Sequence, residues 1–228
     1  MEANMPKKLD ILITGVGGQG VVLAGDILGD VAIAAGYDVK KSDALGMAQR
    51  GGGVVAHIRM GEEVASPLIP QGEVDFLLAF EKMEAARWAH YLRPEAIVVY
   101  NDHAVPPLSV SREETIYPSD EQINLTLTER TPDVFALKGT RVTEEMGNPK
   151  ALNIFMLGAL SMFTPFSPEP WKKAIGEHVP AETLESNLKA FTAGRKEVMR
   201  VMAEIGAEQE RKAMEEAQEH HHEEGCGC

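Results

Sequence analysis

The segment Leu9–Ala24, LDILITGVGGQGVVLA, constrains the fold of this chain more than any other stretch. It begins as an apolar strand, continues through a glycine-rich turn and ends as the first turns of a helix. Gly15, Gly17 and Gly20 fill the spacing G-x-G-x-x-G, and Gly18 adds a fourth glycine. In a strand–turn–helix unit this spacing is typical of a dinucleotide site, because glycine lets the backbone turn sharply and approach a ligand closely.

Two interpretations of this turn remain open. The start of the helix favours an anion, and Asp43, just past the end of the second predicted strand, is placed to reach ribose hydroxyls. Alternatively, the glycines only let the strand and the helix pack closely, without a nucleotide. The local sequence does not decide between them.

A second glycine cluster, Gln49-Arg50-Gly51-Gly52-Gly53, precedes an apolar strand. Three consecutive glycines are entropically costly in an ordinary strand entry. Such a loop can present backbone N–H groups and a guanidinium to a phosphate or a carboxylate. The alternative is a flexible turn with a surface arginine.

The composition is that of a globular protein. With 228 residues, 44% of them hydrophobic and 25% charged, one or two domains with a substantial core are expected. No apolar run reaches the ~18 residues of a membrane helix, and the short polar N-terminus carries no apolar signal region. We therefore expect a cytoplasmic protein without a membrane partner.

Charge and cysteine content exclude some functions for this chain. A net charge of −13 argues against nucleic acid as a partner, since phosphate binding requires a basic face. The cysteines, Cys226 and Cys228, are both in the last three positions, so the body has no disulfide and no cysteine array for an iron–sulfur cluster. Any redox centre is expected in another chain.

Alternating strands and helices predict an α/β fold: a Rossmann-like, doubly wound, mainly parallel sheet with a helical C-terminal third. Residues 1–206 are expected to form one domain, followed by a charged, flexible tail at 207–228. After the first strand, we predict strands at 37–42, 54–60, 74–80, 96–100 and 134–137, with 64–66 as a short hairpin partner. We predict helices at 18–35, 82–91, 120–128, 143–146, 151–163, 171–178 and 182 to about 206. Residues 43–53 are predicted to form a loop and 101–118 an irregular stretch.

Four ordered motifs resemble the gamma-type component of the 2-oxoacid:ferredoxin oxidoreductases, and most of all the small beta subunit of the indolepyruvate enzymes. The motifs are Gly15–Gly20 (GVGGQG), Ser42–Arg59 with its central QRGGG, Phe135–Thr140 (FALKGT), and Gly147–Asn153 (GNPKALN) running into Leu157–Leu160. The resemblance covers about residues 8 to 200 and leaves out the acidic tail. Its order and spacing make it more specific than any single motif.

The resemblance implies a function for the assembly. Enzymes of this family decarboxylate 2-oxo acids on thiamine diphosphate, oxidise the intermediate through [4Fe-4S] clusters, reduce ferredoxin and transfer the acyl group to coenzyme A. In the indolepyruvate enzymes a large alpha subunit holds thiamine diphosphate, Mg²⁺ and the clusters, and aryl pyruvates are the implied substrates. This chain is then expected to bind no cofactor alone, to carry no catalytic residue or metal ligand, and to act only as a subunit.

The resemblance also implies a place for coenzyme A. We expect the two glycine loops to form its binding side, with Arg50 on a phosphate or carboxylate and Gln19 donating a hydrogen bond. The alternative is that these loops only shape the interface with the alpha subunit. The expected coenzyme A residues are Gly15, Gly17, Gly18, Gln19, Gly20, Arg50, Gly51 and Gly52.

Other functions and other residues remain to be weighed. A stand-alone NAD- or flavin-dependent oxidoreductase and a non-catalytic scaffold are the alternative functions. His57 is expected to be packed or at the surface, and Trp171 to anchor packing. Glu81, which follows an apolar strand, is either a site residue or, preferentially, a solvated acid at a helix start. Asn148 is expected to cap a helix that begins at a proline, and Asn153 to bond to a neighbouring loop.

Overall fold

The structure is a computed structural model that describes residues 6–46, 52–106 and 116–224. The strands are β1 (Lys8–Val16), β2 (Asp38–Leu45), β3 (Gly53–Gly61), β4 (Val74–Ala79), β5 (Leu92–Asn101) and β6 (Val134–Leu137). The helices are α1 (Val21–Ala34), α2 (Lys82–Arg87), α4 (Asp120–Thr128), α5 (Gly139–Glu145), α6 (Leu152–Leu160), α7 (Pro168–His178) and α8 (Leu184–Glu224), with 3₁₀ turns at Ala89–Tyr91, Pro149–Ala151 and Ala181–Thr183.

The six strands form one sheet in the order β2-β3-β1-β4-β5-β6. The pairs β1–β4, β4–β5 and β5–β6 are parallel, whereas β3 runs antiparallel to both β1 and β2. The predicted α/β fold is confirmed, with a mixed sheet that is parallel on one side of β1 and antiparallel on the other.

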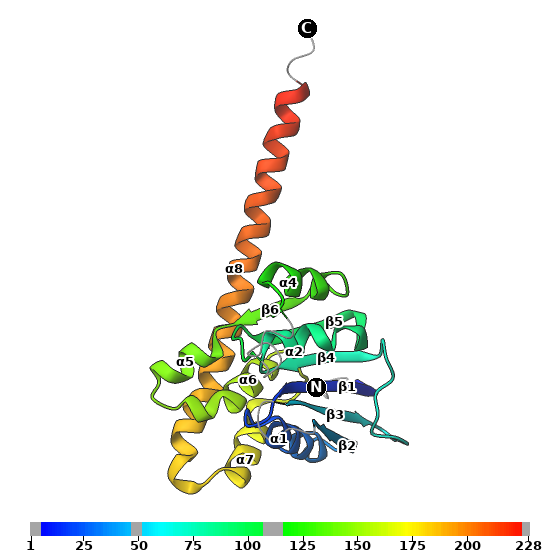
Figure 1. Ribbon diagram of the computed structural model, residues 1–228, viewed down its shortest axis with the longest axis vertical. Helices are drawn as coiled ribbons and strands as arrows, with labels where there is room; N and C mark the ends of the chain where they lie inside the picture. Colours follow the sequence, from blue (N-terminus) through cyan, green and yellow to red (C-terminus); the bar gives the residue numbers. More distant parts are fainter. Residues whose placement is uncertain (1–5, 47–51, 107–115, 225–228) are drawn as a thin grey trace.

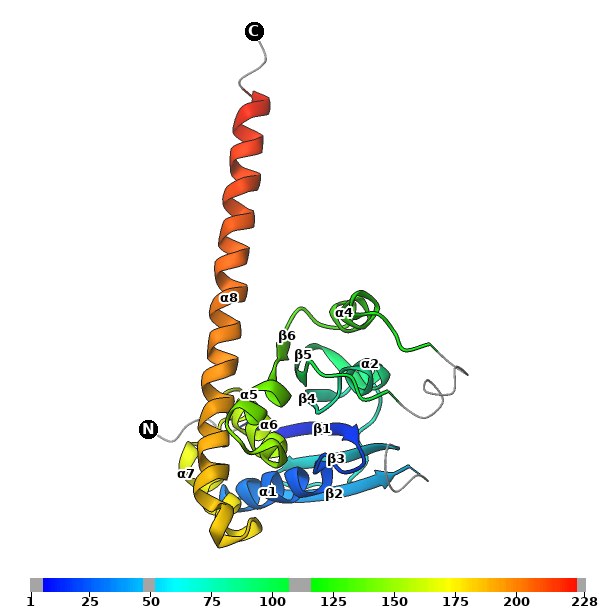
Figure 2. The same cartoon turned by 60° about the vertical axis from the view of Figure 1, so that its left-hand side comes forward.

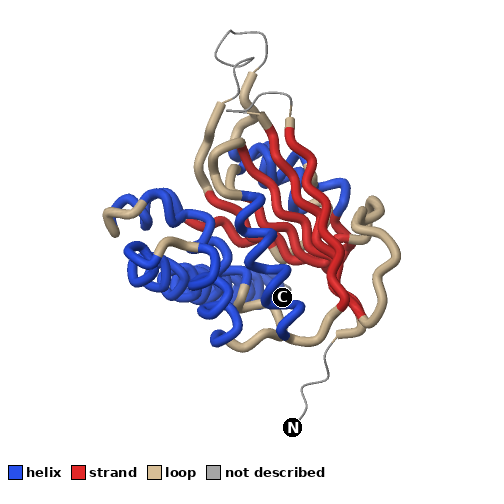
Figure 3. The backbone as a smooth tube through the Cα atoms, turned by 90° about the horizontal axis from the view of Figure 1, so that it is seen from below, coloured by secondary structure: helices blue, strands red, loops and turns tan. Residues whose placement is uncertain are grey.

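Helices cover both faces of the sheet (Figure 3). Alternate residues of β1 belong to the two different core layers. Ile11 and Ile13 belong to the larger core, which α1, α6, α7 and α8 complete. Leu12 faces the smaller core, which is closed by α2, α4 and the 3₁₀ turn after α2. The buried β4 run VDFLLA supplies side chains to both layers, which explains its near-continuous apolar sequence.

The long helix α8 continues well beyond the position at which the sequence predicted its end, near Gly206. Its first half packs on α6, and its second half projects from the body, so that the C-terminal end lies far from the sheet (Figures 1 and 2). The extension is rich in Glu, Ala and Gln, which are good helix formers, and contains no proline. The flexibility of the tail remains a prediction.

Other boundaries also differ from the prediction; for example, α5 begins at Gly139 rather than at 143, and β5 begins at Leu92 rather than at 96. Residues 64–66 form no strand, and β2 pairs with β3 instead. Residues 43–45, predicted as loop, complete β2, whereas 47–51 lie outside the described residues. The helix predicted at 82–91 is divided into α2 and a 3₁₀ turn. Each difference is set by strand pairing or chain reversal, which local periodicity does not encode.

No helix in the described ranges is both long and apolar enough to cross a membrane.

Two glycines set how closely α6 and α8 cross. A Cβ atom on Gly158 would overlap the backbone of Phe191, and one on Gly194 would overlap the backbone of Phe155. These glycines therefore allow direct contact between the two helix backbones, at the centre of the larger core.

We expect Gly194→Ala to lower the free energy of unfolding by about 3 kcal/mol, because the new methyl group overlaps a rigid backbone. Gly206→Ala, in the same helix, should instead stabilise it by about 0.5 kcal/mol, since no atom lies within 4 Å of its Cβ position. Urea unfolding followed by circular dichroism measures both. Equal losses in the two variants would show that helix crossing is not the constraint.

Candidate functional site

The carboxyl ends of the parallel strands define one edge of the sheet. β1 ends at Val16 and leads to α1 on one face, whereas β4 ends at Ala79 and leads to α2 on the other. The chain therefore leaves these neighbouring strands in opposite directions. Ligands of open α/β sheets bind at such a switch point, which makes this edge the candidate site.

The glycine loop between β1 and α1 lies at this edge. Gly18 and Gly20 have φ angles of 103° and 83°, which side-chain-bearing residues rarely adopt. The Gly17 N–H donates to the Gly52 carbonyl oxygen at 2.9 Å, so the loop also contacts the start of β3. The structure thus brings together the two glycine clusters as far as they are described; Gln49, Arg50 and Gly51 lie outside the described residues.

The Gln19 side chain braces the loop from within. Its Oε1 accepts from the Val16 N–H at 2.7 Å, and its Nε2 donates to the Phe80 carbonyl oxygen at 3.1 Å. A Cβ atom on Gly15 would lie 2.8 Å from that Oε1, so this glycine makes room for the brace. The predicted hydrogen bond from Gln19 to a ligand remains a prediction, but both ends of its amide already bond within the protein.

Asn153, expected to bond to a neighbouring loop, lies against the glycine loop. It is 5% exposed, and a Cβ atom on Gly20 would come within 2.6 Å of its Nδ2. Its Oδ1 accepts from the Ile154 N–H. This contact places the start of α6 directly behind the N-terminus of α1.

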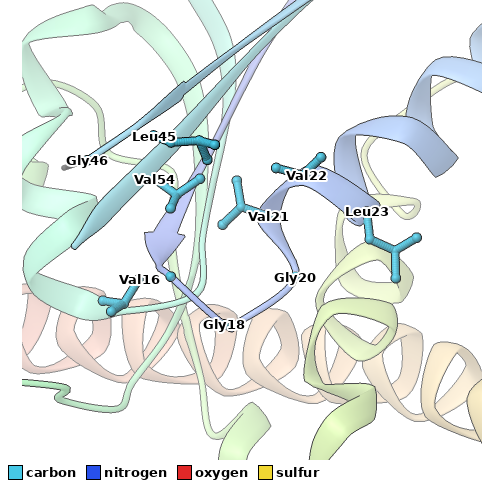
Figure 4. Close-up of a pocket in the computed structure, with 10 residues that line it drawn as sticks. Val16, Gly18, Gly20, Val21, Val22, Leu23, Leu45, Gly46 and Val54 are labelled. Carbon is cyan, nitrogen blue, oxygen red and sulfur yellow. The ribbon is translucent and has the colours of Figure 1, made fainter. Parts of the chain in front are cut away.

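A pocket of about 610 Å³ opens in front of the α1 N-terminus (Figure 4). The residues around it are mostly apolar and include Gly18, Gly20, Val21, Leu45, Gly46 and Val54. Gly20 caps α1 without a side chain, and in the described ranges no acceptor satisfies the N–H groups of Val21, Val22 and Leu23. The pocket thus combines an apolar wall with free backbone donors and the positive end of a helix dipole.

The arrangement departs from a dinucleotide fold at β2. In that fold the acid that binds the ribose ends the strand beside β1. Here β3 lies between β1 and β2, which moves Asp43 one strand spacing, about 4.8 Å, farther away. The Asp43 carboxylate also pairs with Lys41 at 2.9 Å.

Glu81 is not a solvated helix-start acid, as the sequence favoured, because it is fully buried. Its carboxylate caps α2 by accepting from the Glu84 N–H at 2.8 Å, and it accepts from the Val105 N–H at 3.0 Å and from the Tyr117 hydroxyl. Burial and this bond to Glu81 raise the pKa of Tyr117, so its hydroxyl remains a donor. Glu81 therefore fastens the segments on both sides of residues 107–115 to the candidate edge.

Glu84, three residues on, is a second buried acid that sequence reasoning missed. It is 3% exposed, and its Oε1 accepts from the Arg87 Nε at 3.1 Å. Burial raises the pKa of Glu84 above its usual 4.5; Arg87 opposes this change, and the nearby Glu81 adds to it. The pattern E-x-x-E at the end of an apolar strand was the available signal, but only the tertiary structure shows that both acids are buried.

The remaining sequence candidates have structural roles. His57 is packed, as expected, with its Nδ1 accepting from the Ile69 N–H and its ring edge-on to Trp88, and burial lowers its pKa. Trp171 is fully buried against Phe166 and anchors packing as predicted. Asn148 stands at the cap position before Pro149, but its side chain bonds Ser186 across to α8 rather than the helix end.

Comparison with known proteins identifies the class. Residues 10–197 match the family described as pyruvate ferredoxin/flavodoxin oxidoreductase. The chain therefore belongs to this family, and the resemblance inferred from the four motifs is confirmed.

Within the family the similarity is to small subunits. The indolepyruvate oxidoreductase subunit IorB of Pyrococcus horikoshii is 38% identical over 193 residues, which cover 83% of this chain and 96% of that subunit. The gamma subunit of a keto/oxoacid ferredoxin oxidoreductase from Geobacter sulfurreducens superposes with a TM-score of 0.62 at 24% identity, covering 84% of this chain and 99% of that one.

A second similar structure is that of a much longer chain. It is the 2-oxoglutarate:ferredoxin oxidoreductase of Magnetococcus marinus, with 2-oxoglutarate, coenzyme A and succinyl-CoA bound. It superposes with a TM-score of 0.66 at 23% identity over 86% of this chain and 32% of that one. These two structures share the fold described above.

We expect Gly20→Ala to cost about 3 kcal/mol of stability, because it adds a clash with Asn153 to the strain of a left-handed residue. Gly18→Ala should cost only about 1 kcal/mol, since its φ is also positive but its Cβ position is open. Combining Gly20→Ala with Asn153→Ala should recover at least about 0.5 kcal/mol relative to additivity, measured by urea unfolding. Strict additivity would show that the side-chain contact is immaterial.

Glu84 should make stability fall as pH rises. Its raised pKa means that the native state binds more protons than the unfolded state above pH 4.5, so the native state loses stability through that window. Glu84→Gln, which cannot ionise, should therefore gain melting temperature over the wild type between pH 4 and pH 8. The comparison variant is Glu185→Gln: the hydrogen bond from Lys189 lowers the pKa of Glu185, so its curve should parallel the wild type above pH 4.5, and the wild type should lose stability relative to it only as the pH falls below 4.5. Parallel curves for Glu84→Gln and the wild type would contradict the assignment.

Proposed function

We propose that this chain is the small subunit of a thiamine-diphosphate-dependent 2-oxoacid:ferredoxin oxidoreductase that acts on indolepyruvate or related aryl pyruvates. The enzyme decarboxylates the 2-oxo acid oxidatively to acyl-CoA and CO₂ and reduces ferredoxin. In this assembly the chain forms the coenzyme A side of the site. The pocket in front of the α1 N-terminus is the observation that carries this assignment.

Its chemistry suits coenzyme A in two respects. The apolar wall, including Val21, Leu45 and Val54, matches the extended pantetheine arm, which carries few charges. The unsatisfied N–H groups of α1 match a phosphate, and we assign to it the guanidinium of Arg50, two residues before Gly52 in the sequence. Gly18 and Gly20, in left-handed conformations, let the backbone come close enough to donate.

The catalytic groups belong to a larger partner in this proposal. In the described part of the chain, no cluster of His, Cys, Asp and Glu could hold a metal ion. The sequence has no cysteine before Cys226, so its body offers no ligand set for an iron–sulfur cluster. We therefore assign thiamine diphosphate, Mg²⁺ and the clusters to the alpha subunit, and expect this chain to be inactive alone in the cytoplasm.

The substrate assignment follows the IorB similarity, whereas the Magnetococcus marinus enzyme acts on 2-oxoglutarate. Purification of the chain from its native host should yield a brown complex with a large subunit. That complex should reduce ferredoxin with indolepyruvate and coenzyme A. Faster turnover of 2-oxoglutarate would replace the aryl assignment, and tight NAD binding by this chain alone would favour a stand-alone Rossmann oxidoreductase instead.

We expect Arg50→Ala to raise the KM for coenzyme A of the assembled complex about tenfold, since one charge-assisted contact to a phosphate is lost. Assembly should stay intact, as measured by size-exclusion chromatography. Arg141→Ala is the control, because Arg141 lies exposed on α5, paired with Glu145. Loss of assembly, with an unchanged KM in any residual complex, would assign the Arg50 loop to the subunit interface.

A further inference from the structure

A second, smaller pocket of about 310 Å³ opens at the same edge of the sheet. It lies toward α2, and its lining includes Val16, Gly53, Met83, Glu84, Arg87 and Val105. Val16 lines this pocket and the larger one in front of α1. The two pockets are therefore neighbours, on either side of the point where β1 ends and β3 begins.

The smaller pocket contains a buried carboxyl oxygen without a partner. Glu84 is 3% exposed, and its Oε1 is engaged by Arg87, but its Oε2 has no hydrogen-bond partner in the described structure. Trp88 acts on the Glu84 carboxyl as a weak hydrogen-bond donor that lowers its pKa, the smallest of the influences on that group, yet no donor reaches Oε2 with the geometry of a hydrogen bond. A buried acceptor without a hydrogen-bond partner lowers stability by about 1–3 kcal/mol, so a ligand that donates a hydrogen bond to Oε2 would remove this cost.

The backbone leaves room for that donor. A Cβ atom on Gly53 would lie 3.1 Å from the Glu84 Oε2, so any side chain at this position would cover the oxygen. Gly53 does not have a positive φ, and its backbone conformation does not by itself require glycine. We therefore attribute the glycine at position 53 to the space that it leaves open beside the Glu84 Oε2.

The pocket thus offers three complementary features. The first is a free acceptor, the Glu84 Oε2. The second is an apolar wall formed by Met83, Val16 and Val105. The third is the guanidinium of Arg87, whose side chain is 54% exposed. Together they match a flat heteroaromatic ring with an exocyclic amine and an anionic group nearby. An adenine with a phosphate on its ribose has this combination.

We propose that this smaller pocket holds the adenine of coenzyme A, with Glu84 accepting from the exocyclic amine and Arg87 facing the 3′-phosphate. The proposal rests on the proposed function, because it extends the same ligand from the neighbouring pocket. The Gly17 N–H bond to Gly52 joins the walls of the two pockets, so one extended molecule can occupy both. Its pyrophosphate lies at the α1 N-terminus, its pantetheine arm in the larger pocket and its base in the smaller one.

The test uses the assembled complex and isothermal titration with coenzyme A and with 4′-phosphopantetheine, which lacks the adenosine. In Glu84→Gln, Arg87 retains the amide oxygen, so the amide NH₂ takes the place of Oε2 and presents a donor to the amine. We expect about tenfold weaker binding of coenzyme A and unchanged binding of 4′-phosphopantetheine. Gly53→Ala should act in the same direction by covering the acceptor, and Glu145→Gln, in an exposed pair on α5, should match the wild type. Circular dichroism confirms that each variant is folded.

The outcomes separate this proposal from the function on which it rests. If Arg50→Ala weakens coenzyme A binding but Glu84→Gln and Gly53→Ala do not, the adenine site is wrong and the coenzyme A assignment stands. Equal losses of both probes in Glu84→Gln would also overturn the adenine site. If Glu84→Gln instead raises the KM for the 2-oxo acid alone, the pocket holds the aryl ring of the substrate. If the wild-type complex binds no coenzyme A, the proposed function itself fails.

Discussion

The amide of Gln19 holds the candidate edge together. By accepting from Val16 and donating to Phe80, it joins the end of β1 to the chain just beyond β4, across the point where the two connections diverge. The glycine loop can close on this brace because Gly15 carries no side chain, and Asn153 supports it from behind Gly20. The loop's polar side chain is thus used internally, and the backbone N–H groups at the start of α1 are what the loop presents to the pocket.

The parts of the fold that could be predicted from the sequence are those set by local pattern. The apolar run of β4, the strand at 134–137 and the helix at 120–128, which Ser119 and Gln122 close with a capping box, lie where the sequence placed them. The insertion of β3 between β1 and β2 could not be predicted, because strand order depends on pairing between distant segments. The extent of α8 was missed for a related reason: a single glycine at 206 weakens a helix without ending it.

The candidate site divides in the same way. The geometry of the first loop could be predicted from its glycines, because their spacing follows from the backbone conformation that the loop adopts. Glu81 and Glu84 gave only a weak signal, an E-x-x-E pattern after an apolar strand, because two acids near a helix start are ordinarily solvated. Their burial results from the approach of Tyr117 and Val105 to Glu81, and from the packing of α2 on β1 and β4, with Gly53 beside the Glu84 carboxylate. Buried carboxyls with a shifted pKa are concentrated at functional sites, so Glu84, whose pKa is raised by burial, adds weight to the edge that the glycines indicate.

Backbone N–H groups and the Glu84 carboxylate, the two kinds of recognition group at this edge, differ in how far the fold depends on them. The donors around the glycine loop are backbone groups whose positions require Gly18 and Gly20 in left-handed conformations, so any substitution there alters the fold together with the site. Glu84 is a side chain on a short helix, and its Oε2 satisfies no other group in the described structure. Burying an acceptor without a partner costs stability, and this oxygen supports no neighbouring element. A ligand-binding role explains such an atom, whereas a packing role does not. A phosphate-bearing ligand would thus be positioned by the rigid backbone and selected by the buried carboxyl beside it.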